Sequence, residues 1–178
     1  MRLFRIELMI FLGVITFACV SDDLDEADIF GSEEGEITAT INGSSFRSFG
    51  VSSTAFVEDF AGGDQLVIGG IDISDLDRLT GVTVVFIIPD FSALSVGDTF
   101  SGSSMDMIMT GGYAIDINGD NTIGATTELA ASNTAAITAI DRNRKLVSGT
   151  FSYNAIDEDT KNVYEVRNGV FTQIPYEQ

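Results

Sequence analysis

The chain has 178 residues, of which 9 are Lys or Arg and 27 are Asp or Glu, giving a formal net charge of −18 at pH 7. This charge disfavours binding to nucleic acid and to anionic lipid headgroups. The chain has no histidine and one cysteine, so Ser-His-Asp and Cys-His catalytic groups and histidine-based metal sites are excluded. We therefore expect a protein that is not an enzyme and that does not bind nucleic acid.

Residues 1–18 have the pattern of a secretory signal peptide. Arg2 and Arg5 precede a mostly apolar run over residues 8–18, as a charged n-region precedes an apolar h-region. The run is too short for a transmembrane helix, which needs about 20 apolar residues. Cys19 follows directly.

The stretch Thr16-Phe-Ala-Cys19 resembles a bacterial lipobox, in which the thiol is acylated and cleavage leaves the cysteine as the new N-terminus. A lipobox usually has leucine where this chain has Thr16. The alternative is a cysteine discarded with the signal peptide. We favour lipidation of Cys19, because an exported chain rarely keeps one unpaired thiol without a use. Cleavage would remove two of the nine basic residues and one of the 27 acidic ones, leaving 7 and 26 and a net charge of −19.

Residues 19–36 form a predicted acidic tether. Eight carboxylates and no Lys or Arg lie between Val20 and Glu36, so the segment should stay extended and solvated. It resembles the signal that exports Bacteroidetes lipoproteins to the outer face of the outer membrane. We expect an outer-membrane lipid anchor at the cell surface, with an acidic linker on the periplasmic side as the alternative.

Residues 37–178 are predicted to form one domain, long enough for a core of its own. Its periodicity is that of β-strands: Ile37, Ala39 and Ile41 alternate with threonines, and Asn42-Gly43 predicts a hairpin turn. Further strands are expected over residues 65–73, 82–88, 105–117, 135–140, 145–156 and 162–174.

Two segments of this domain have special features. The run 82–88 is apolar enough to be buried on both faces and ends at Pro89. The stretch 126–133 fits a short helix as well as a strand. With 18 glycines and 2 prolines, the pattern predicts an all-β fold, an antiparallel β-barrel or β-sandwich of about eight to ten strands.

The stretch 116–124 resembles a calcium loop. Asp116, Asn118 and Asp120 stand at positions 1, 3 and 5, and the sequence of the stretch is similar to that of dockerin loops. Positions 6 and 12 are Asn121 and Thr127, where a calcium loop has glycine and glutamate. We favour a solvated β-turn here, and the alternative is a weak calcium site with Asp116, Asn118 and Asp120 as its ligands.

Three motifs at the two ends of the domain resemble a family of uncharacterised Bacteroidetes lipoproteins. They are T-A-T-I-N-G-S-S-F at 38–46, K-L-V-S-G-T-F-S-Y-N-A at 145–155 and N-G-V-F at 168–171. The resemblance implies a lipocalin-like or calycin-like β-architecture and no known activity. The chain lacks the Gly-x-Trp motif of true lipocalins, since it has no tryptophan.

In the second motif, Val147, Gly149, Phe151, Tyr153 and Ala155 share one strand face. We expect this face to pack in the core, and a pocket lined by Phe151 and Tyr153 is the alternative. Gly149 is expected at a bulge or a close backbone approach, with Phe151 lying across it.

Two non-enzymatic functions fit these features. One is binding of a small apolar ligand inside a barrel, held by aromatic side chains such as Phe86 and Phe151. The other is a structural or adhesive role at the cell surface, in which the outer face contacts glycans or partner proteins. The calycin-like resemblance places ligand binding first. In both cases the lipid bilayer is a partner through acylated Cys19.

Overall fold

The computed structural model describes residues 35–48, 50–60, 62–102, 107–117, 123–127 and 132–178. The predicted signal peptide, Cys19 and the tether as far as residue 34 lie outside these residues. Within the described ranges, no helix has the length and apolar character needed to cross a membrane.

The described residues form eleven strands and two short 3-10 helices, so the predicted all-β class is confirmed. The strands are β1 (Glu36–Ile41), β2 (Ser44–Ser48), β3 (Ser53–Phe60), β4 (Gly63–Asp72), β5 (Arg78–Ile88), β6 (Thr99–Ser101), β7 (Ile108–Ile117), β8 (Ile123–Thr126), β9 (Thr134–Asp141), β10 (Leu146–Ile156) and β11 (Val163–Glu177). The 3-10 helices are η1 (Gly50–Ser52) and η2 (Phe91–Ala93).

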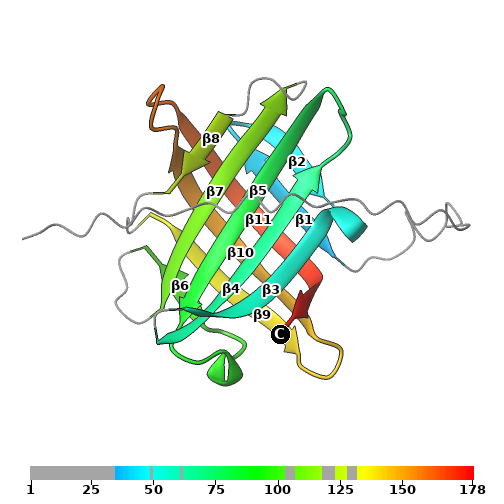
Figure 1. The fold of residues 1–178 in the computed structure, drawn as a ribbon, viewed down its shortest axis with the longest axis vertical. Coiled ribbons are helices and arrows are strands. Elements are labelled where there is room, and N and C mark those ends of the chain that lie inside the picture. The colour runs from blue at the N-terminus through cyan, green and yellow to red at the C-terminus, as the bar shows by residue number, and fades with distance from the viewer. Residues whose placement is uncertain (1–34, 49, 61, 103–106, 118–122, 128–131) are drawn as a thin grey trace, which may run out of the picture.

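The strands pair in the order β2-β1-β11-β3-β4-β5-β7-β6-β9-β10-β8, and β10 also pairs with β11. Because β11 has β3 as one neighbour and β10 as another, the sheet closes on itself. In Figure 1, β3, β4, β5 and β7 lie in front and cross β9, β10 and β11 behind them. The result is a closed barrel, one of the two predicted architectures.

The pairing differs from the prediction in two ways. First, β3, β6 and β8 are additional strands, short or rich in polar residues, which the apolar pattern did not indicate. Second, the sheet is mixed, because β3 is parallel to β11 and β6 is parallel to β7. The parallel pairing of β3 with β11 follows from the chain path. Strand β1 is antiparallel to both β11 and β2, so β2 runs parallel to β11, and β3 continues in the direction of β2.

Local predictions can be compared with the strands directly. The hairpin turn is confirmed, since Asn42 (φ 48°) and Gly43 (φ 85°) both have the left-handed backbone that a two-residue turn requires. The expectation that run 82–88 is buried on both faces is wrong. Val85 and Ile87 are only partly buried, because among the described residues no second layer covers the outside of β5. Of the stretch 126–133, residues 128–131 lie outside the described residues, and Thr126 ends β8.

Strands β10 and β11 are joined by two reciprocal glycine–phenylalanine pairs. Gly149 lies opposite Phe171, and Phe151 lies opposite Gly169. A Cβ atom on Gly169 would lie 2.5 Å from the Phe151 ring, and one on Gly149 would overlap the Phe171 ring and the backbone oxygen of Ala136. Each ring therefore occupies the space that a side chain on its partner would need.

The predictions for Gly149 are thus confirmed in part. The register shifts beside Gly149 against both neighbouring strands, as expected of a bulge. The ring that lies across Gly149 is however Phe171, not Phe151, because the contact is made between strands and not along one strand.

Two irregularities bend β11, and the one at Gln173 is the register shift beside Gly149. Asn168 (φ 52°) and Gln173 (φ 49°) have left-handed backbone at points where the register shifts against β10. Bulges of this kind bend a strand and increase its twist. The bends let one strand pair with β10 along its length, with β1 over its first part and with β3 at its end.

We predict that Gly169→Ala lowers the free energy of unfolding by about 1–3 kcal/mol, because the added methyl group overpacks the Phe151 ring. Gly124→Ala, in β8, is the matched control, since a Cβ atom there meets nothing within 4 Å. Urea denaturation of both variants measures the difference. Equal stability of Gly169→Ala and Gly124→Ala would contradict the contact.

Candidate functional site

The centre of the barrel is occupied by side chains. The Phe86 ring lies edge to face with Phe100 and Phe171, at centroid distances of 4.8 and 5.9 Å. The Phe151 ring lies 6.0 Å from Tyr153 and 6.4 Å from Phe171. Phe86 and Phe151, the residues predicted to hold an apolar ligand, are both buried and pack against other rings.

Tyr153 links the two sides of the barrel. Its ring lies against Gly111 of β7, where a Cβ atom would be 2.6 Å away. Its hydroxyl donates a hydrogen bond to the carbonyl oxygen of Gly112 at 2.5 Å. Complete burial raises the pKa of this hydroxyl far above its ordinary value, so it remains a donor. Tyr153 therefore joins β10 to β7 as a hydrogen-bonded structural contact.

The segment that contains η2 packs into the core. Phe91 and Leu94 are buried, and the Phe91 ring lies 5.1 Å from the ring of Tyr176. Arg142 donates from one nitrogen to the carbonyl oxygens of Phe91, Ser92 and Leu94, at 3.1, 3.0 and 2.7 Å. Its guanidinium also lies over the Phe91 ring, 5.4 Å from the centroid. These contacts fix the segment in place.

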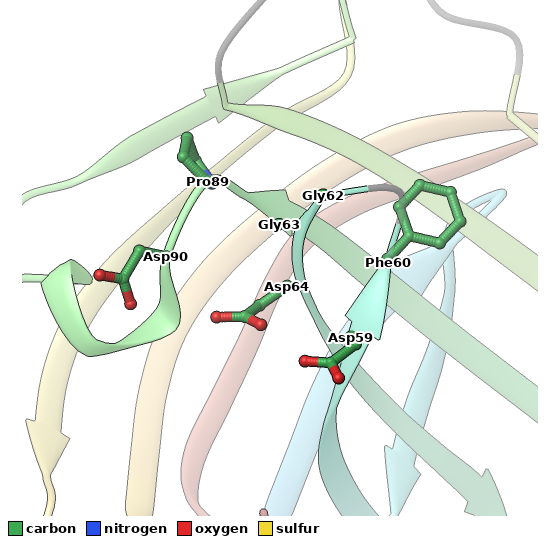
Figure 2. A pocket seen from close by; sticks show the side chains of 7 residues that line it. All are labelled: Asp59, Phe60, Gly62, Gly63, Asp64, Pro89 and Asp90. Carbon is green, nitrogen blue, oxygen red and sulfur yellow. The ribbon is translucent and has the colours of Figure 1, made fainter.

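An acidic pocket of about 390 Å³ lies between the β3–β4 turn and this segment (Figure 2). Asp59, Asp64 and Asp90 line it, and their carboxylates face the same opening, whereas the ring of Phe60 points the other way. Three carboxylates in one pocket invite comparison with a metal site. Within the described residues, however, no group of three or more His, Cys, Asp or Glu side chains has an arrangement that could hold a metal ion.

Two of these carboxylates have backbone partners instead. Asp64 accepts a hydrogen bond from the backbone N–H of Phe91 at 2.6 Å. Asp90 accepts one from the backbone N–H of Ser92 at 2.8 Å and so caps η2. Hydrogen bonds from the side chain and backbone of Ser92 lower the pKa of Asp90. The pocket thus stabilises the η2 segment.

A larger groove of about 880 Å³ lies over β6, β9, β10 and β11. We call it the hydroxyl groove, because five of its lining residues are serines or threonines. It is lined by Thr99, Phe100, Ser101, Thr134, Ala135, Ala136, Thr150, Phe151, Ser152, Arg167, Asn168, Gly169 and Val170.

Arg167 is the one charged residue among the described residues that line this groove. Its guanidinium donates to the carbonyl oxygens of Tyr153 and Val166, at 2.8 and 3.0 Å, and to the side-chain oxygen of Asn154 at 2.5 Å. The carbonyl of Tyr153 lies beside the bulge of β11. Arg167 therefore satisfies backbone groups where the ladder is interrupted.

Comparison with known proteins finds a match to a family model over part of the barrel. Residues 109–175 match a domain of unknown function, DUF6252. No curated protein and no solved structure matches the chain. The DUF6252 region contains Gly111, Gly149 and Gly169 and the rings of Tyr153, Phe171 and Phe151 that pack on them.

The residues predicted to form sites are only partly described. Asp116 belongs to β7 and lies opposite Leu79 of β5. Asn118, Asp120 and Cys19 lie outside the described residues. The calcium site and the lipid attachment therefore stay predictions.

The acidic pocket and the hydroxyl groove were not predicted from the sequence. Asp59 and Asp64 lie opposite each other on β3 and β4, at equal distances from the turn between these strands. This symmetric spacing could have predicted that the two carboxylates lie close together. The hydroxyl groove could not be found in this way. The outward positions of β10 were predicted correctly, but their neighbours on β6 and β9 depend on the strand order.

We predict that Asp59→Asn raises the free energy of unfolding by about 0.2–1 kcal/mol at low salt, because like charges directly opposite on paired strands destabilise a sheet. Asp77→Asn removes the same charge from an exposed position outside the pocket. Denaturant unfolding at low and high salt compares the two. Equal gains for both variants would show that only the total charge matters.

Proposed function

We propose that the protein is a bacterial lipoprotein, anchored in the outer membrane through acylated Cys19, with a non-enzymatic barrel that has a structural or adhesive role at the cell surface. In this proposal the outer face of the barrel contacts glycans or partner proteins. An apolar ligand held inside the barrel is the alternative that we now place second.

The packing of the barrel centre is the observation that carries this choice. A small barrel can hold one ligand only if its inward side chains leave room for it. Here the ring of Phe86 packs against the rings of Phe100 and Phe171, and Tyr153 joins β10 to β7. Binding through the outer face needs no rearrangement of these groups.

The start of the fold supports the proposed anchor. The first described strand, β1, begins at Glu36, the last residue of the predicted tether. The tether carries carboxylates and no Lys or Arg, so self-repulsion would keep it extended. Such a tether would separate the barrel from the bilayer to which Cys19 attaches. The C-terminal motifs that resemble Bacteroidetes lipoproteins lie within the DUF6252 match.

Two features fit the proposed non-enzymatic role. The sequence contains no histidine. Among the described residues, the carboxylates of Asp64 and Asp90 in the acidic pocket accept hydrogen bonds from backbone N–H groups. These two carboxylates thus hold the η2 segment. Asp59 is the third carboxylate of the pocket.

We predict that radioactive palmitate labels the wild-type protein in its host cell and does not label Cys19→Ala, because the thiol is the acylation site. Thr16→Leu, which restores the usual lipobox residue, should remain labelled and serves as the matched control. Label on Cys19→Ala would refute the anchor.

We predict that native mass spectrometry of the freshly purified protein gives the mass of the polypeptide and its anchor alone. A denaturing spectrum of the same sample provides the reference mass. A small apolar molecule that is present in the native spectrum and lost on denaturation would favour a ligand-binding function instead.

A further inference from the structure

The structure points to the hydroxyl groove as a binding site for a neutral polysaccharide chain. This inference rests on the proposed surface role and names the partner that the outer face would take. The groove has about 880 Å³, within the size range of small-molecule sites.

The groove exists because the outward side chains at this place are small. Along one row of paired residues, Thr99 lies opposite Ala136, which is followed by Thr150 and Val170 on the next two strands. The equivalent outward row on the other side of the barrel is bulkier, with Phe56, Val67 and Val85 on β3, β4 and β5. The bulge at Asn168 bends β11 at the edge of the groove.

The polar groups of the groove suit a polyhydroxylated ligand. Thr99, Thr134 and Thr150 are exposed, and within the described part of the chain their hydroxyls have no protein hydrogen-bond partner. A hydroxyl both donates and accepts, as does each hydroxyl of a sugar. The methyl groups of the threonines, Ala136 and Val170 offer apolar contact to the C–H groups of a sugar ring.

Charge selects a neutral chain over a charged one. None of the described lining residues is acidic, so the groove offers no partner for a basic peptide. Its one cation, Arg167, is already engaged with Tyr153, Val166 and Asn154 and lies 3.7 Å from the Glu165 carboxylate. The net charge of −18 repels a polyanion.

The test is a titration of the isotope-labelled mature chain, followed by NMR at millimolar ligand. The probes are linear hexaoses of glucose, mannose and xylose, with hexagalacturonate as the acidic counterpart. We expect at least one neutral hexaose to shift the methyl signals of Thr99, Thr134, Thr150 and Ala136, and hexagalacturonate to have a smaller effect.

Two blocking variants and one control locate the site. Thr150→Arg and Thr134→Arg place a long side chain in the groove and should weaken binding about tenfold or more. Thr54→Arg, on an exposed outward position of β3, should leave binding unchanged. Unshifted signals outside the groove show that each variant is folded.

Three outcomes would overturn the inference: no shift with any probe, shifts that lie outside the groove, or tighter binding of hexagalacturonate than of every neutral hexaose. Failure here is distinct from failure of the proposed function. The latter would appear as a co-purifying apolar molecule in the native mass spectrum, on which this titration does not depend.

Discussion

The barrel depends on one constraint: two phenyl rings, those of Phe151 and Phe171, each pack on a glycine of the neighbouring strand. Phe171 lies on Gly149 and Phe151 lies on Gly169, so each strand supplies both a ring and the space for one. A slip of two residues would preserve the alternation of buried and exposed positions. It would however place the Phe171 ring against Val147 or Phe151, where a side chain already fills the space. The two pairs therefore fix the register of β10 against β11.

This register determines both the inside and the outside of the barrel. Inside, it brings Phe171 against Phe86 and places Tyr153 where its ring meets Gly111 and its hydroxyl reaches β7. Outside, it aligns Thr150 with Val170, the pair that forms part of the floor of the hydroxyl groove. In the proposed function, a barrel packed in this way meets other molecules through its outward side chains.

Most strands and the first hairpin turn could be predicted from strand periodicity and turn residues. The alternation in β10 and the Asn42-Gly43 turn were predicted because each depends on neighbours in the chain. The parallel pairing of β11 with β3 and the left-handed backbone at Asn168 and Gln173 could not be predicted, because both follow from closure of the sheet. The ring over Gly149 was assigned to Phe151 for the same reason: a sequence gives the residues of one strand, but the contact crosses to another. The acidic pocket and the hydroxyl groove likewise join residues from separate strands.

The chemical shifts of the Hα protons of Gly149 and Gly169 test the central claim, that aromatic rings packed on glycines fill the barrel. Protons that lie over the face of an aromatic ring are shielded by its ring current. We predict that both glycines give Hα signals far upfield of their usual β-sheet positions, whereas Gly124, which has no neighbour within 4 Å of a Cβ position, does not. Ordinary shifts at Gly149 and Gly169 would mean that the rings lie elsewhere and that the interior is open to a ligand.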